Sequence, residues 1–168
     1  EEEELKGASR GSAYHKVLEM LDFSKEYTLE QISEEIEALQ KKGLLTETMK
    51  ICVKEEDILT FLQSPIGRRM QKASQNGLLH AEQPFVLGEE LEAGEMMLVQ
   101  GIIDTYFEED GELVVLDYKT DRVWSAKELV ERYRVQLEYY AKALEQITGK
   151  SVKEKRIYSF ALQREIEV

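Results

Sequence analysis

Residues 101–120 of the chain read GIIDTYFEEDGELVVLDYKT and contain two β-rich runs separated by an Asp-Gly pair. Val, Ile, Tyr and Phe fill much of both runs, which is typical of strands, and Asp110–Gly111 is a common two-residue hairpin turn. With a two-residue loop, Glu109 faces Glu112, and the residue numbers of every further cross-strand pair sum to 221. The turn therefore predicts which side chains meet across the two strands.

Three charged side chains meet on one face of this hairpin. Asp104 and Asp117 have numbers that sum to 221, so we expect them opposite each other, with Cβ atoms about 4.5–5.5 Å apart. Lys119 lies two residues beyond Asp117 and points to the same face, whereas Tyr118 points to the other. A three-residue loop would change the parity of the pairing and separate these side chains.

Two carboxylates that face each other across a ladder are destabilising unless a cation lies between them. Asp117 also follows four apolar residues, where an uncompensated charge is costly. Carboxylate and carbonyl oxygens suit Mg²⁺, with Mn²⁺ as a substitute, and such an ion activates water and polarises a phosphoryl oxygen. A neighbouring ammonium stabilises the developing negative charge. The pattern favours metal-dependent phosphodiester hydrolysis; the other interpretation is a solvated hairpin face with mixed charges.

The rest of the chain predicts a single α/β domain, with a central mixed sheet flanked by helices behind an N-terminal helical segment. Residues 1–76 read as mainly helical, and residues 77–168 as the sheet and its helix. Apolar spacing and caps predict helices at 12–21, 29–42, 55–62, from Pro65, and from Ser125 to a stop at Gly149. Strands are expected at 78–87, in the hairpin and at 154–162.

Composition narrows the classes of function. The formal net charge of −12 over 168 residues argues against a stand-alone nucleic-acid binder, since phosphate affinity comes mainly from Lys and Arg. A single cysteine, Cys52, excludes a disulfide framework and a four-cysteine iron–sulfur cluster within the chain. No phosphate-binding loop of ATPases and no membrane-length apolar run is present. We expect a cytoplasmic piece of a longer polypeptide.

The combined motifs resemble the RecB-type branch of the PD-(D/E)XK nuclease superfamily. Besides the hairpin, they are GSAYHKVLEML near the N-terminus, AEQPF before the hairpin and QLEYYAKAL after it, so the resemblance covers nearly the whole chain. The chain is most similar to the C-terminal nuclease domain of AddA-type (RexA-type) ATP-dependent helicase/nuclease subunits of bacteria. That resemblance implies a restriction-endonuclease-like fold and a Mg²⁺-dependent exonuclease that cuts single-stranded DNA. It also implies helicase domains in the same chain, an AddB/RexB-type second subunit, and a role in double-strand break repair and recombination.

The same resemblance implies roles for individual residues. Metal ligands would be His15, Asp104, Asp117 and the backbone carbonyl of Tyr118; catalytic residues would be Asp104, Asp117, Lys119, Gln136 and Tyr140. Gln136 and Tyr140 match the Q-x-x-x-Y motif, which supports the site or contacts the strand. Glu82 matches the acidic residue of the first strand, whose role is less uniform.

Each of these residues also has a structural interpretation. His15 fits the edge of an apolar helix face, Tyr140 fits a core-facing stripe, and Glu82 fits a surface acid. Trp124 could stack on a base, although packing of its loop is the commoner arrangement. Three further assignments are Met96 and Met97 in the strand core, His80 on the surface, and Arg68, Arg69 and Lys72 in ion pairs or on phosphates.

Two other functions compete with the nuclease. One is a non-catalytic module of the same fold that guides DNA or docks a partner subunit. The other is a free-standing exonuclease, which the acidic charge disfavours.

Overall fold

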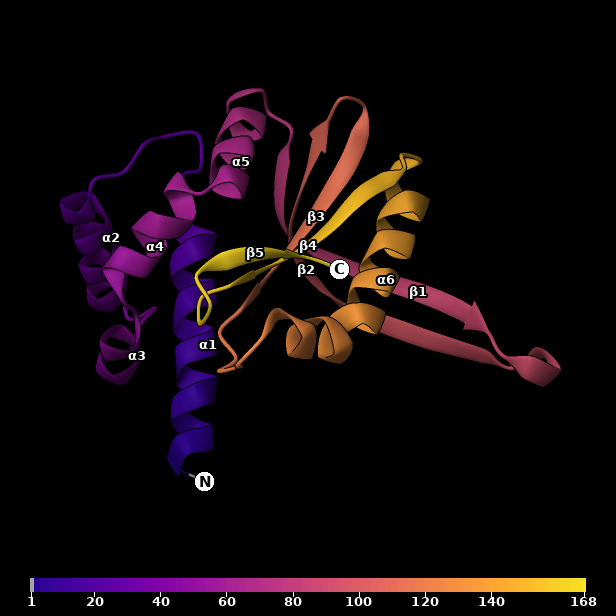
Figure 1. Ribbon diagram of the computed structural model, residues 1–168, viewed down its shortest axis with the longest axis horizontal. Helices are drawn as coiled ribbons and strands as arrows, with labels where there is room; N and C mark the ends of the chain where they lie inside the picture. The colour runs from indigo at the N-terminus through magenta and orange to yellow at the C-terminus, as the bar shows by residue number, and fades with distance from the viewer. Residues whose placement is uncertain (1) are drawn as a thin grey trace.

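The computed structural model describes residues 2–168, with side chains from residue 6 onward, as a five-stranded mixed sheet with helices on both faces (Figure 1). The strands follow each other in the order β1-β2-β3-β4-β5, and only β3 and β4 are parallel. The α6 helix makes the crossover that a parallel pair requires. The predicted α/β class is confirmed.

The elements are α1 (Glu2–Met20), α2 (Leu29–Lys41), α3 (Glu47–Cys52), α4 (Glu55–Gln63), α5 (Pro65–Gln75), β1 (Leu79–Glu90), η1 (Glu92–Gly94), β2 (Met96–Glu109), β3 (Glu112–Lys119), α6 (Ala126–Thr148), β4 (Val152–Ser159) and β5 (Arg164–Glu167).

The β3 strand separates two cores. Its even-numbered residues, such as Leu116 and Tyr118, pack with the helices of the N-terminal half, whereas Leu113 and Val115 pack against α6. This alternation is what a strand buried on both faces requires. Asp117 and Lys119 therefore lie on the α6 side, and Tyr118 lies on the other, as the sequence predicts.

Local signals explain most helix boundaries. The Thr28 and Gln31 capping box begins α2, the Ser64 hydroxyl accepts from the Gly67 N–H at the start of α5, and Gly149 ends α6 with a φ of 71°. The start of α1 was predicted wrongly at residue 12, because its preceding turns are rich in Glu, Leu, Lys and Ala, which favour helix. No helix in the described part of the chain has the length and apolarity to cross a membrane.

The outer halves of β1 and β2 form a two-stranded arm that projects from the body (Figure 1). One face of the arm, including Phe85 and Leu87, packs toward α6. The opposite face leaves Val86 and Leu98 about two-thirds exposed, at 66% and 71%. Met96 is 63% exposed on this arm, so its assignment to the core was wrong. Met96 shares the outward face of the arm with Leu98, so strand alternation directs its side chain to solvent.

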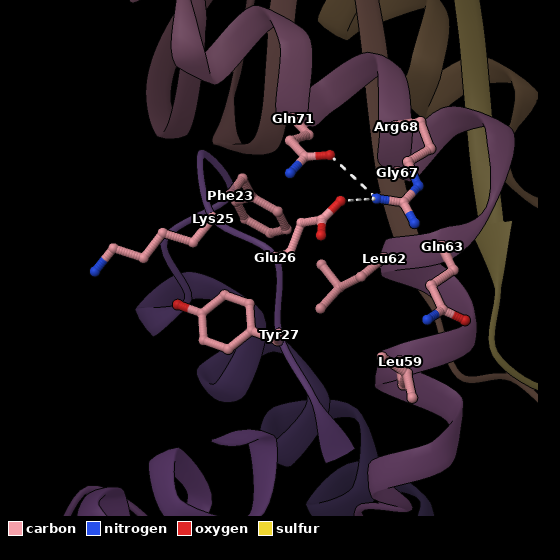
Figure 2. Close-up of a pocket in the computed structure, with 10 residues that line it drawn as sticks. All are labelled: Phe23, Lys25, Glu26, Tyr27, Leu59, Leu62, Gln63, Gly67, Arg68 and Gln71. Carbon is pink, nitrogen blue, oxygen red and sulfur yellow. Dashed lines mark hydrogen bonds and ion pairs between the residues drawn. The ribbon is translucent and has the colours of Figure 1, made fainter. Parts of the chain in front are cut away.

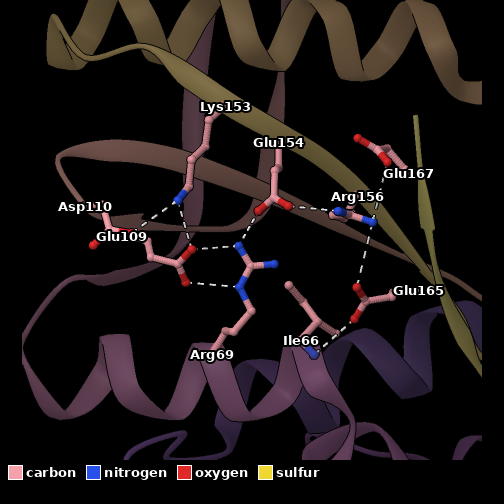
Figure 3. A network of polar contacts seen from close by, with 9 residues as sticks. All are labelled: Ile66, Arg69, Glu109, Asp110, Lys153, Glu154, Arg156, Glu165 and Glu167. Carbon is pink, nitrogen blue, oxygen red and sulfur yellow. Dashed lines mark hydrogen bonds and ion pairs between the residues drawn. The ribbon is translucent and has the colours of Figure 1, made fainter.

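A network of ion pairs ties the hairpin turn to α5 and β4 (Figure 3). Arg69 donates two hydrogen bonds to Glu109, at 3.0 and 2.8 Å, and also pairs with Glu154. Lys153 lies 2.9 Å from Glu109. We call Arg69, Glu109, Lys153 and Glu154 the turn-end cluster. Of the two uses expected for the basic residues of α5, ion pairing is the one that Arg69 adopts.

Candidate active site

The hairpin has the register that its turn predicts. Asp110 and Gly111 both have positive φ, at 54° and 80°, as a two-residue hairpin loop requires. The ladder runs from Glu109 opposite Glu112 to Thr105 opposite Leu116, so every pair sums to 221. Asp104 and Asp117 occupy the next position.

At this position the two strands separate. The Tyr118 N–H donates a 2.8 Å hydrogen bond to Oδ2 of Asp104 instead of to a carbonyl of β2. Beyond the opening, β3 continues its pairing with β4 alone. The hairpin therefore ends in a gap between strands that two carboxylates occupy.

Asp117 is the least compensated charge in this gap. Its side chain is only 3% exposed, and Lys119 Nζ lies 2.9 Å from its Oδ2. That oxygen is buried and has an ion-pair neighbour but no hydrogen bond of good geometry. Burial, and secondly the charge of Asp104, raise the pKa of Asp117 to about 8. The site therefore holds a buried carboxyl group whose ionised form its own surroundings do not fully stabilise.

Asp104 interacts with the imidazole of His15 in α1. The Nδ1 atom of His15 lies 3.2 Å from Oδ1 of Asp104, and Nε2 lies 3.2 Å from the Tyr118 carbonyl oxygen. Burial alone lowers the pKa of His15, but the hydrogen bond and charge of Asp104 outweigh it and raise that pKa. Burial alone would raise the pKa of Asp104, and the bonds from His15 and Asp117 lower it instead. His15 thus bridges two of the predicted metal-binding oxygens.

Three residues of α6 lie at or beside the same gap. Gln136 Oε1 accepts a 3.1 Å hydrogen bond from Lys119 Nζ, which fixes the position of the ammonium. The face of Tyr133 lies beneath that ammonium, with 3.9 Å from Nζ to the ring centroid. Tyr140 is buried and packs edge-on against Phe85, and burial followed by the charges of Asp117 and Asp104 raises its pKa. Tyr133 is a site neighbour that the sequence motifs did not single out.

Glu82 lies at the same level of the sheet. The β1–β2 register pairs Ala81 with Thr105 and Gln83 with Ile103, which leaves Glu82 opposite Asp104 with a φ of 50°. Burial, and secondly the charge of Asp104, raise the pKa of Glu82. Glu82 is half-buried beside the gap, so the surface-acid interpretation describes it only in part.

The donor set fits a hard divalent cation. Among the described residues, no three His, Cys, Asp or Glu side chains already form a metal cage. However, Mg²⁺ binds proteins through one or two carboxylates and keeps several waters. Two buried carboxylates beside a carbonyl oxygen, one with an oxygen that lacks a hydrogen bond, meet that requirement. Asp104, Asp117 and the Tyr118 carbonyl are therefore the atoms that could hold the ion.

A pocket elsewhere in the chain has different chemistry (Figure 2). It is a cavity of about 60 Å³ between the segment that follows α1 and the helices α4 and α5. Phe23, Tyr27 and Leu62 line it, together with the Arg68–Glu26 ion pair, and none of the predicted site residues does. The opened hairpin remains the candidate site.

Two further predictions have clear outcomes. His80 is exposed, as expected, and its ring stacks on Tyr106 at 4.8 Å between centroids. Trp124 is 97% exposed, so the interpretation that it packs within its loop was wrong. The loop backbone is held by other side chains, which leaves the indole free.

Comparison with known proteins supports the motif assignment. Residues 1–167 match the PD-(D/E)XK nuclease superfamily. Similar curated proteins are the ATP-dependent helicase/nuclease A subunits from Lachnoclostridium phytofermentans, at 36% identity over 210 residues, and Clostridium novyi, at 38% over 180 residues. A third relative of the same name, from Thermoanaerobacter pseudethanolicus, is 44% identical over 169 residues. These alignments cover 100%, 99% and 93% of the chain but only 15%, 14% and 13% of the relatives, so the chain spans a small part of their length.

Proposed function

The chain belongs to the PD-(D/E)XK nuclease superfamily, and we propose that it hydrolyses DNA phosphodiester bonds with Mg²⁺, for which Mn²⁺ can substitute. Asp104, Asp117 and the Tyr118 carbonyl would hold the ion, with His15 as the neighbouring ligand. The observation that carries this proposal is the buried, under-compensated carboxylate of Asp117 beside Asp104 and Lys119. Mixed charge on a solvated hairpin face does not account for a side chain that is 3% exposed.

The residues of the chain would have different roles at the scissile phosphate. When bound, the ion would supply an activated water and would polarise a phosphoryl oxygen. Lys119 stabilises the negative charge that develops on the phosphate oxygens and orients the attacking water. Gln136 and the ring of Tyr133 hold the Lys119 ammonium in place. Tyr140 packs behind the acids and limits the access of bulk water to them.

The relatives suggest the setting of this reaction. Their names describe ATP-dependent helicase/nuclease subunits, of which the chain spans 13–15%. We infer an exonuclease domain, residues 1–168, whose helical part (1–76) packs on a catalytic part (77–168). It would receive single-stranded DNA from helicase domains of the same chain, beside an AddB/RexB-type subunit, during double-strand break repair and recombination in the bacterial cytoplasm. The net charge of −12 supports this arrangement, in which the nuclease domain cuts DNA that other domains or subunits hold.

A pair of matched substitutions tests the reaction. Asp117→Asn and Asp110→Asn remove one charge each from the same hairpin, one in the gap and one at the exposed turn. The unaltered chain and Asp110→Asn should cut labelled single-stranded DNA with Mg²⁺ or Mn²⁺ and should stop with a chelator. Asp117→Asn should lower the rate by roughly 1000-fold or more. Equal cleavage by the two variants would contradict the proposed site.

A non-catalytic module that guides DNA or docks a partner subunit is the second candidate. The exposed apolar face of the arm, with Val86 and Leu98, is the observation that favours it. The same assay decides between the two, because a module would show no metal-dependent cleavage.

A further inference from the structure

Trp124 is the single tryptophan of the chain, and 97% of its side chain is exposed to solvent. An indole ring usually contributes a large apolar area to a core or an interface. Among the apolar side chains of the described residues that are largely exposed, Trp124 has the highest exposed fraction. It lies in the loop of residues 120–125 that joins β3 to α6, directly after Lys119.

The exposure of Trp124 does not come from a loose loop. Asp121 accepts hydrogen bonds from the Tyr133 hydroxyl, at 2.7 Å, and from Arg132, at 2.6 Å. On the far side, the Trp124 N–H donates to Glu128 at 3.1 Å. The Thr120 carbonyl accepts from Arg10 of α1 at 2.9 Å. The backbone is anchored at both ends, and the indole extends from a fixed support.

The loop shares that support with Lys119. Tyr133 binds Asp121 through its hydroxyl and lies beneath the Lys119 ammonium with its ring face. Trp124 follows Lys119 by five residues, so their Cα atoms are at most about 18 Å apart. The indole therefore lies within a few nucleotide lengths of a phosphate bound at Lys119.

The charge of the loop also suits a nucleic-acid strand. Arg122 is exposed and, within the described part of the chain, has no carboxylate partner, whereas Arg132 is paired with Asp121. Surfaces that bind single-stranded nucleic acid combine cations for the backbone with aromatic rings on which bases stack. An unpaired arginine two residues from a free indole is such a combination.

We propose that Trp124 stacks on an unpaired base of the strand whose scissile phosphate lies at Lys119, with Arg122 on a neighbouring phosphate. This inference rests on the proposed nuclease function and assigns a residue that recognises its single-stranded substrate. A base inside a duplex is already stacked on both faces and is not available to the ring. The indole therefore selects for unwound DNA.

Intrinsic fluorescence tests the contact directly, because all tryptophan emission of the chain comes from Trp124. A short oligothymidylate is titrated into the 168-residue chain in the presence of a chelator, so that the strand stays intact. A strand of the same length without bases is the matched ligand, since it has the same phosphates. We expect saturable quenching by the oligothymidylate and little by the abasic strand. Equal quenching by both strands would overturn the stacking proposal.

Kinetics give a second, independent readout. Trp124→Ala should lower kcat/KM on single-stranded DNA by roughly 5- to 100-fold, and Trp124→Phe should retain most of the activity. Ile51→Ala truncates another exposed apolar side chain, 78% exposed on α3, and should leave kcat/KM unchanged.

The outcomes separate the two proposals. Normal cleavage by Trp124→Ala, with no base-dependent quenching, would overturn the stacking proposal. In that case the nuclease reaction stands and the stacking contact fails. Base-dependent quenching by a chain that cuts nothing would leave the contact intact and reject the reaction.

Discussion

The two ends of the β2–β3 hairpin carry similar charges with opposite consequences. In the turn-end cluster, Glu109 accepts hydrogen bonds from Arg69 and Lys153 (Figure 3). These bonds, and that from Arg69 most strongly, lower the pKa of Glu109 to about 2. In the gap at the other end, burial and Asp104 raise the pKa of Asp117 to about 8. The difference lies in compensation: Glu109 is partly exposed between two cations, whereas Asp117 is buried beside Asp104 with the Lys119 ammonium as its own cationic neighbour. The cations of the turn-end cluster stabilise the ionised form of Glu109, whereas the neighbours of Asp117 do not stabilise its ionised form.

The largest effect expected from this comparison concerns two lysines. Lys119 and Lys153 each lie 2.9 Å from a carboxylate oxygen, of Asp117 and Glu109 respectively. Lys119→Met should lower the single-turnover rate of DNA cleavage roughly 100- to 1000-fold, because its ammonium would stabilise the transition state. Lys153→Met should change that rate less than about twofold. Similar losses in the two variants would erase the distinction between the clusters.

Stability should respond in the opposite sense. Arg69→Met leaves Glu109 and Glu154 half-buried without their guanidinium, so the free energy of unfolding should fall by about 1–3 kcal/mol. Asp117→Asn removes a buried charge that the fold does not compensate, so metal-free stability should stay equal or rise. Urea unfolding with a chelator present measures both. A large loss of stability in Asp117→Asn alone would indicate that the gap is a structural ion pair.

The smallest expected effect is on the pH dependence of stability. The pKa of Glu109 is lower in the folded chain than its ordinary value of 4.5, so its contribution is complete above 4.5 and is lost as pH falls toward 2. The pKa of Asp117 is raised from 3.8, so its contribution has the opposite sign and is lost as pH rises toward 8. The free energy of unfolding should fall less steeply at acid pH in Arg69→Met than in the unaltered chain. The difference should be about 1–2 kcal/mol at most, because Glu109 is partly exposed.

Unfolding curves collected across this pH range in metal-free buffer check both limbs. Asp117→Asn should weaken the pH dependence of the free energy of unfolding only above pH 4. An unchanged acid limb in Arg69→Met would mean that the cluster contributes little to stability.

The sequence predicted the parts of the site that depend on local rules. The Asp110–Gly111 turn determines the register, and strand alternation then places Asp117 and Lys119 on one face. Contacts between distant elements followed only from the motif resemblance. No local pattern shows that the ring of His15 bridges Asp104 and the Tyr118 carbonyl, or that Gln136 binds Lys119.

Other features depend on packing that a single sequence does not express. The short elements α3 and β5 contain six and four residues, too few for a clear period. Met96 lies on the outward face of the arm, in phase with Leu98, whereas Met97 and Val99 alternate to the inner face. Trp124 was assigned to packing on residue type alone, and the anchors of its loop, such as Tyr133, are nine residues away.

Calorimetric titration of Mn²⁺ into the metal-free chain tests the central claim most directly. The unaltered chain and Arg69→Met should bind the ion with similar affinity, because the turn-end cluster is already compensated. Asp117→Asn should lose that binding, because the buried carboxylate that the ion would neutralise is gone. Undiminished Mn²⁺ binding by Asp117→Asn, or loss of binding in Arg69→Met alone, would contradict the assignment of the opened hairpin as the metal site.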